Sequence, residues 1–119
     1  MGNQSRSAIA EGESLPIGQD QVNIVGHAIE CRICAEDPEQ SFMPSTGILV
    51  RYQPPQGNIR VENGYHEGDE ISVYYDSLMA KVIAWGQTRE DSIASMQSAL
   101  QEFAIAGVKS TISFCRFVL

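Results

Sequence analysis

The feature that most constrains this chain is the stretch GHAIECRICAEDP at residues 26–38, where apolar and polar side chains alternate before an acidic turn. Successive side chains of a β-strand point to opposite faces, so the alternation predicts a strand over residues 26–35. The strand then has two different faces: one holds Ile29, Cys31, Ile33 and Ala35, and the other holds Ala28, Glu30, Arg32 and Cys34. The first set suits a protein core.

Glu30 and Arg32 are the side chains of the second face that carry chemistry. A planar guanidinium on a rigid strand suits an anionic or carbonyl oxygen in a partly dry cleft. The alternative interpretation is a solvated or salt-bridged strand face, which is common on protein surfaces. The pattern by itself leaves both interpretations open.

Length and charge exclude several classes of function. The 119 residues predict one domain with a modest core. A net charge of -7, with the eight Lys and Arg spread along the chain, argues against nucleic acid and anionic membrane surfaces as partners. No run of about 18 apolar residues is present, so the sequence predicts no membrane span.

Three cysteines and two histidines are the candidate metal or redox residues. Cys31 and Cys34 form a CxxC pair, but on a strand their thiols point to opposite faces, and no second CxxC or HxxxH completes a tetrahedral site. We therefore expect no metal site, and free thiols indicate a reducing compartment. His27 and His66 are interpreted as surface residues.

The remaining strands and turns follow from β-branched and aromatic runs between Gly, Pro and Asn. Residues 1–10 are expected to be a leader or a disordered end, and residues 11–24 a connecting segment. Further strands are predicted at 48–52, 59–62, 71–75 and 78–85. Tyr74, Tyr75 and Trp85 are expected to pack in the core, and Asp76 beside them to need an arginine partner.

The pattern then changes to a helical period. Thr88 is a predicted N-cap, and Gly107 a predicted helix end. The apolar stripe of this helix consists of Ile93, Met96, Leu100 and Phe103. A second helix is expected from Ser110 or Thr111, with Ile112, Cys115, Val118 and Leu119 inward. The chain ends inside this apolar pattern, which we interpret as truncation. The predicted fold is α+β, with four or five antiparallel strands followed by two helices on one side.

Three stretches together resemble the C-terminal domain of biotin carboxylase: GHAIECRICAEDP, FMPSTGILVRYQPP and YYDSLMAKVIAWGQTREDSIASMQSALQEFAIAGVKS. This family is the component shared by acetyl-, propionyl- and methylcrotonyl-CoA carboxylases and pyruvate carboxylase. The resemblance covers residues 11–119 and implies a half-barrel antiparallel sheet with flanking helices, packed on an ATP-grasp domain outside these residues. It implies an ATP-dependent ligase that uses bicarbonate to carboxylate biotin on a carrier protein.

By the same resemblance, Arg32 is the catalytic residue, which contacts the ureido oxygen of biotin and stabilises the enolate. Asp76 and Glu30 are expected at the edge of the biotin site, and Arg60 at a homodimer interface, although the loop near Gly57 lacks an aromatic residue of the family. Cys34 stands where asparagine or tyrosine is common.

The implied cofactors are biotin, ATP and magnesium in the parent enzyme, with none expected on this chain alone. The implied partners are the ATP-grasp domain, a biotin carrier domain, a carboxyltransferase and a second copy of the parent. The expected location is the cytoplasm, or the mitochondrial matrix. The chain alone is expected to be inactive. The alternative is a non-catalytic docking or assembly module.

Overall fold

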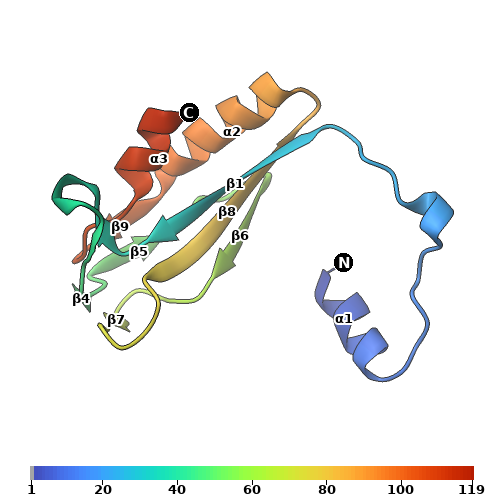
Figure 1. The fold of residues 1–119 in the computed structure, drawn as a ribbon, viewed down its shortest axis with the longest axis horizontal. Helices are drawn as coiled ribbons and strands as arrows, with labels where there is room; N and C mark the ends of the chain where they lie inside the picture. Colours follow the sequence, from blue (N-terminus) through green and yellow to red (C-terminus); the bar gives the residue numbers. More distant parts are fainter. Residues whose placement is uncertain (1) are drawn as a thin grey trace.

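The computed structural model describes residues 2–119, and its centre is a three-stranded antiparallel sheet. The strand order is β1 (His27–Cys34), β8 (Leu78–Gly86) and β6 (Ile59–Asn63). β8 therefore lies between the other two strands, and Figure 1 shows the three running side by side. The predicted strands at 26–35, 59–62 and 78–85 are confirmed within one or two residues.

Two helices, α2 (Arg89–Glu102) and α3 (Ile112–Val118), cover one face of this sheet (Figure 1). The register opposes Cys31 to Val82 and Val82 to Val61, so apolar side chains from three strands meet under the helices. Met96 and Leu100 of α2 are fully buried against them. Removing such side chains from water is the main source of stability for a domain of this size.

Short two-stranded ladders surround the central sheet. They pair β2 (Glu36–Asp37) with β3 (Met43–Pro44), β4 (Gly47–Ile48) with β7 (Glu70–Ile71), and β5 (Arg51–Gln53) with β9 (Ala104–Ala106). A 3-10 turn, η2 (Pro38–Gln40), connects β2 to β3. All pairings in the described residues are antiparallel and no barrel closes, which confirms the α+β class with an open, half-barrel-like sheet.

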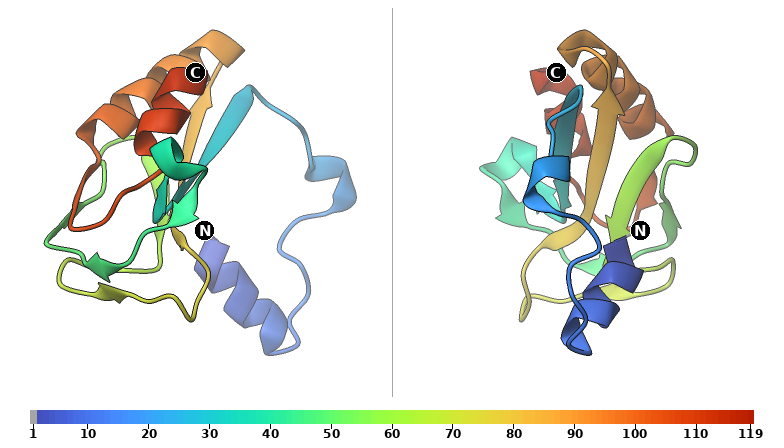
Figure 2. Two further views of the ribbon diagram at one scale, coloured as in Figure 1. Left: turned by 60° about the vertical axis from the view of Figure 1, so that its left-hand side comes forward. Right: turned by 90° about the vertical axis from the view of Figure 1, so that its right-hand side faces the viewer.

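The N-terminal segment leaves this body. In the segment expected to be a leader or a disordered end (1–10), residues 2–10 form helix α1 (Gly2–Ala10), while Met1 lies outside the described residues. An arm containing the 3-10 turn η1 (Gln19–Gln21) then leads to β1. Figures 1 and 2 show α1 and the arm apart from the α2 and α3 layer.

The predicted strand at 71–75 is wrong beyond Ile71. Side chains replace ladder hydrogen bonds there: the Tyr74 N–H donates to Ser72 Oγ at 3.1 Å, and the Leu78 N–H donates to Asp76 Oδ1 at 2.8 Å. Such local bonds favour turns over strands. Tyr74 and Tyr75 are therefore exposed, at 88% and 77%, and not packed in the core as predicted.

Two further core and strand predictions also need correction. Trp85 is 46% exposed, because it lies on the sheet face away from the helices, where its indole N–H donates to the Val25 carbonyl at 2.8 Å. The predicted strand at 48–52 is broken between β4 and β5, because the Leu49 N–H donates to the Asp69 carbonyl and not to a strand partner.

Helix α2 begins as predicted but ends earlier. Thr88 and Asp91 form a capping box, with the Asp91 N–H donating to Thr88 Oγ1 at 3.1 Å. The helix ends at Glu102, and not at Gly107, because Ala104–Ala106 pairs with β5. Gly107 instead has a φ of 104° after β9, where a Cβ atom would collide with the Ile48 carbonyl.

Helix α3 begins at Ile112, within two residues of the predicted start at Ser110 or Thr111, although Val118 is 64% exposed and not inward. On α2, the buried stripe is Ser92, Met96, Ala99 and Leu100, while Ile93 is half-buried. Ser92 is the polar residue of this buried stripe. Its hydroxyl group has a hydrogen-bond partner, because it donates to the Arg89 carbonyl at 2.7 Å.

Tyr52 provides a test of the packing between β5 and α2. Its phenol donates to Asn63 Oδ1 at 2.9 Å, and its ring meets Phe103 edge-on at 5.4 Å. Tyr52→Phe should lower the free energy of unfolding at neutral pH by about 1 kcal/mol, through the lost hydrogen bond. Urea unfolding measures this, with the exposed Tyr74→Phe as the matched control. Equal values for the two variants would contradict the assignment.

The same residue makes stability pH-dependent. Burial raises the pKa of Tyr52 to about 12. A group whose pKa is raised by folding contributes stability below its unfolded pKa of about 10, and this contribution is lost as pH rises toward the folded value. The native chain should therefore lose more stability than Tyr52→Phe between about pH 10 and 12.

Candidate functional site

The sheet face opposite the helices carries five charged side chains, which we call the charged face. They come from all three central strands: Glu30 and Arg32 from β1, Lys81 from β8, and Arg60 and Glu62 from β6. Strand alternation places them there, since their sequence neighbours point into the core. The predicted division of β1 into a core face and a polar face is confirmed by its burial pattern.

The register arranges these charges in two rows. Arg32 lies opposite Lys81, which lies opposite Glu62, and Glu30 lies opposite Ile83, which lies opposite Arg60. The carboxylate of Glu62 accepts from Arg60 at 2.6 Å from Nη2 and 2.7 Å from Nε. This pair satisfies the β6 end of the face, although both side chains are more than half exposed, so it adds little stability.

Arg32 and Lys81 form the positive part of the charged face. Like charges directly opposite each other on neighbouring strands are unfavourable. Among the described residues neither side chain forms an ion pair. An anion or a developing oxyanion beside these two cations would relieve the repulsion.

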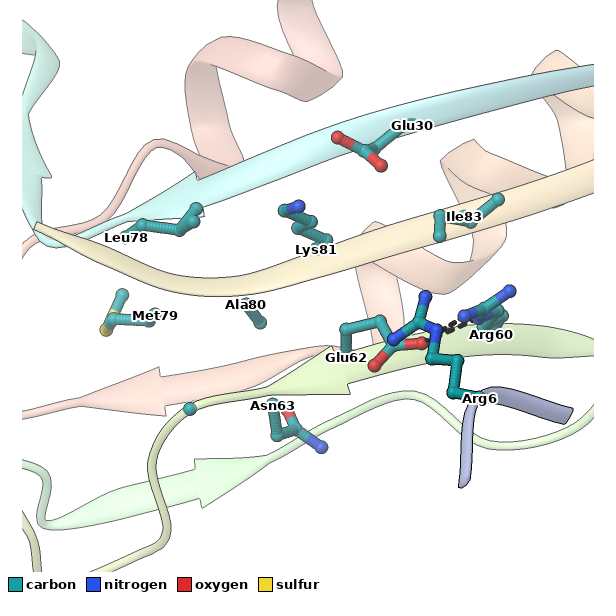
Figure 3. Close-up of a pocket in the computed structure, with 11 residues that line it drawn as sticks. Arg6, Glu30, Arg60, Glu62, Asn63, Leu78, Met79, Ala80, Lys81 and Ile83 are labelled. Atoms are coloured by element: carbon teal, nitrogen blue, oxygen red, sulfur yellow. Dashed lines mark hydrogen bonds and ion pairs between the residues drawn. The ribbon is translucent and has the colours of Figure 1, made fainter. Parts of the chain in front are cut away.

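A pocket of about 380 Å³ opens on the same face (Figure 3). Its lining includes Glu30, Arg60 and Lys81, and Arg6 of α1 projects over it toward β6. Two of the predicted site residues, Glu30 and Arg60, thus share one cavity. Arg32 and Asp76 do not line it, and Arg32 lies in the neighbouring row of the same face.

Asp76 differs from its prediction. It is exposed in the loop before β8, and its carboxylate accepts from the Leu78 N–H, so burial does not oblige it to find an arginine. Asp76 nevertheless lies near Arg32. Both charges act electrostatically on the thiol of Cys34, which indicates that both side chains are close to it. Asp76 and Arg32 therefore both lie near Cys34, and no ion pair joins them among the described residues.

Cys34 lies where the register of β1 and β8 shifts, after Ile33. Burial and the charge of Glu36 raise the pKa of its thiol, while a hydrogen bond with Ser77 and the charge of Arg32 oppose this. Ser77 Oγ also donates to Glu36 Oε1 at 2.5 Å, which ties the β8 entry loop to β2. Such irregularities are frequent beside functional sites.

Thr111 holds the strand segment that carries Arg32, and sequence reasoning missed this role. Its hydroxyl accepts from the Cys34 N–H at 3.0 Å and donates to the Arg32 carbonyl at 3.2 Å, and its own N–H donates to the Cys34 carbonyl at 3.1 Å. Thr111 was predicted only as a possible first residue of the second helix, and its side chain makes no cap bond to α3. Lys81 was also missed, because its position depends on the register of β8.

The candidate metal-binding residues do not form a cluster. In residues 2–119 no group of three or more His, Cys, Asp and Glu side chains converges on a metal position. Cys31 is buried and Cys34 faces the other side, so the CxxC pair does not converge. His27 and His66 are exposed, as predicted. Within the described chain, no helix has the length and apolar character needed to cross a membrane.

Comparison with known proteins gives consistent matches. The family described as biotin carboxylase C-terminal domain matches residues 30–119. Biotin carboxylase 1 of Bacillus subtilis is 48% identical over 107 residues, covering 89% of this chain and 24% of that protein. The mitochondrial methylcrotonoyl-CoA carboxylase subunit alpha of Dictyostelium discoideum is 43% identical over 110 residues, covering 91% of this chain and 16% of that protein.

Solved structures agree with the sequence relatives. The biotin carboxylase domain dimer of Hydrogenobacter thermophilus 2-oxoglutarate carboxylase, in complex with MgADP, ADP and bicarbonate, has a TM-score of 0.88 and 46% identity. The aligned region covers 93% of this chain and 25% of the Hydrogenobacter thermophilus chain. The biotin carboxylase subunit of a pyruvate carboxylase matches with a TM-score of 0.88 and 45% identity, over 95% of this chain and 25% of that chain. The chain thus spans a quarter or less of each of these four relatives.

Thr111→Val tests the anchor beneath Arg32. Valine keeps the shape but removes the hydroxyl, leaving the Cys34 N–H without this acceptor, so unfolding should become easier by about 1–3 kcal/mol. Thr111→Ser keeps the hydroxyl and is the matched control. Urea unfolding of both variants measures the difference, and a valine variant as stable as the serine variant would show that these bonds contribute nothing.

Proposed function

The chain belongs to the family of biotin carboxylase C-terminal domains, and from this premise we propose that it forms part of an ATP-dependent biotin carboxylase. The parent enzyme would use bicarbonate to carboxylate biotin on a carrier protein. The support is the match over residues 30–119 and the likeness to a carboxylase domain whose structure contains MgADP and bicarbonate. The specific contribution of this domain is a cation at the biotin site.

The observation that carries this proposal is the placement of Arg32. Its guanidinium is exposed on a strand whose backbone is held by Thr111, and no ion pair neutralises it among the described residues. Lys81 lies directly opposite it on β8, so two cations are neighbours at this point of the charged face. A preorganised cation stabilises negative charge that develops in a transition state, because no reorganisation is needed at that moment.

Biotin fits this arrangement as the group that presents an oxygen to Arg32. Biotin supplies a ureido nitrogen that accepts the carboxyl group. Arg32 binds the adjoining ureido oxygen and stabilises negative charge there when that nitrogen loses its proton. Arginine suits the role because its charge persists at any pH an enzyme meets. Glu30 and Asp76 lie at the edge of the same region and would orient the ligand or the basic groups.

The nucleotide machinery does not fit these residues. The described chain contains no cluster of acidic side chains for magnesium, and its glycines lack the strand-to-helix context of a phosphate loop. We therefore place ATP, magnesium and bicarbonate on an ATP-grasp domain of the same parent. The other proposed partners are the biotin carrier domain and a carboxyltransferase.

Arg60 is proposed to contribute to a homodimer of the parent, by analogy with the dimeric carboxylase domain of Hydrogenobacter thermophilus. Its pairing with Glu62 would have to rearrange or be shared across that interface. We propose a cytoplasmic or a mitochondrial location; one relative is mitochondrial by name.

A docking or assembly role is the second candidate, favoured by exposed apolar side chains. Val73, Tyr74 and Tyr75 are 69%, 88% and 77% exposed in the loop before β8. Clusters of this kind often mark surfaces that another protein covers. Finding no ATP-grasp coding region in frame upstream of this sequence would favour the docking role over the catalytic one.

Arg32→Ala in the intact carboxylase tests the catalytic role. Biotin carboxylation should fall by about 100- to 1000-fold, because one charge-stabilising group is lost, while ATP and bicarbonate binding change little. Arg51→Ala is the matched control, since Arg51 is exposed on β5 and its guanidinium donates to Gln53 Oε1, away from the charged face. An equal loss of ATP binding, bicarbonate binding and carboxylation would contradict the role assigned to Arg32.

The chain alone should not cleave ATP when bicarbonate and free biotin are supplied, because the groups that bind nucleotide are absent from its described residues. Phosphate release with and without biotin measures this. Biotin-dependent turnover that disappears in Arg32→Ala would place a complete nucleotide site within these residues. It would contradict the proposal that ATP, magnesium and bicarbonate bind to a separate ATP-grasp domain.

A further inference from the structure

The three cysteines occupy two different environments. Cys31 lies on the core face of β1 and is 8% exposed. Cys115 of α3 is half-buried and packs against the same core. Cys34 lies on the other side of β1, near Arg32 and Asp76. The thiol partner of Cys31 is therefore Cys115, far away in the sequence, and not its CxxC neighbour.

The contact between Cys31 and Cys115 is direct. The Cys31 thiol donates a hydrogen bond to the Cys115 sulfur. Backbone bonds hold the two elements in place, because the Cys115 N–H donates to the Thr111 carbonyl at 2.9 Å and the Thr111 N–H donates to the Cys34 carbonyl at 3.1 Å. The sulfurs thus meet between two ordered segments and not at a loop tip.

The hydrogen bond shifts the pKa values of the two thiols in opposite directions. The bond from Cys31 lowers the pKa of Cys115 to about 7, while burial opposes this and the Thr111 side chain adds a smaller lowering contribution. The same bond and burial raise the pKa of Cys31. Near neutral pH a fraction of Cys115 is therefore thiolate beside the Cys31 thiol, and the thiolate is the nucleophilic form of cysteine.

We propose that Cys31 and Cys115 form an oxidative modification site, whose substrate is hydrogen peroxide or a small hydroperoxide and whose product is a disulfide joining β1 to α3. This goes beyond the carboxylase role and does not depend on it, since the two sulfurs lie on the face of β1 opposite Arg32. The function of the bond is to tie the terminal helix to the strand that carries Arg32.

The chemistry balances in two steps. The Cys115 thiolate attacks one peroxide oxygen, the O–O bond breaks, hydroxide leaves, and Cys115 becomes a sulfenic acid. The Cys31 sulfur then attacks the Cys115 sulfur, the S–O bond breaks and the S–S bond forms. The hydroxyl group leaves with the Cys31 proton as water. Two thiols lose two electrons in total, and the peroxide is reduced to two molecules of water.

Peptide mapping of the peroxide-treated chain tests the proposal. Hydrogen peroxide is added to the reduced 119-residue chain, which is then alkylated, digested without reductant and analysed by mass spectrometry. The expected product is an intramolecular Cys31–Cys115 bridge with Cys34 still free, and urea during oxidation should abolish this selectivity. A Cys31–Cys34 bridge, intermolecular bridges only, or sulfinic acid without a bridge would each overturn the proposal.

Two matched variants and a pH series complete the experiment. Cys34→Ser should still form the bridge, and Cys115→Ser should not form any bridge at Cys31. The rate of bridge formation should rise as the pH increases through about 7, because the thiolate fraction of Cys115 rises. The oxidised native chain should also unfold at a temperature about 5–15 °C higher than the reduced chain. A pH-independent rate, or a lower unfolding temperature, would contradict the geometry.

Discussion

The pairing of β8 with both β1 and β6 is the constraint on which the rest of the structure depends. In this antiparallel register Cys31, Val82 and Val61 are aligned across the sheet, and their sequence neighbours are turned to the other face. A slip by one residue would move every charged side chain into the core and every core residue to the surface. The apolar layer of α2 and α3 therefore selects the register, and the register in turn assembles the charged face.

Only part of the charged face is neutralised by ion pairs within the described part of the chain, and the cations that are left unpaired there connect the fold to the proposed function. Arg60 and Glu62 satisfy each other on β6, whereas Arg32 faces Lys81 on β8. Arg32 is exposed and forms no ion pair among the described residues, so its charge is available to a ligand. The hydrogen bonds from Thr111 supply the rigidity, because they hold the Arg32 backbone from the opposite side of the strand. A biotin carboxylase would need such a cation, and the proposed role of Arg32 uses it.

The predicted strand at 71–75 was wrong because side-chain hydrogen bonds competed with regular structure there. Ser72 and Asp76 accept from nearby N–H groups and break the predicted strand at 71–75. Trp85 is a large aromatic residue of the kind that often packs in a core, yet strand alternation places it opposite Ala28 on the exposed face. The early end of α2 has a different cause, since Ala104–Ala106 gains a ladder with β5 that local propensity does not reveal.

The sequence by itself determined the local elements whose signals are contained within a few residues. The alternation of β1 predicted its two faces, and Thr88 with Asp91 encoded the start of α2. The motifs around Arg32, taken in their order along the chain, also carried the resemblance to the family, which the match over residues 30–119 confirms. Tertiary structure alone decided which distant side chains meet: Lys81 beside Arg32, Thr111 beneath it, and Cys115 on Cys31. These contacts depend on register and helix docking, which arise from burial summed over the whole core and not from any local pattern.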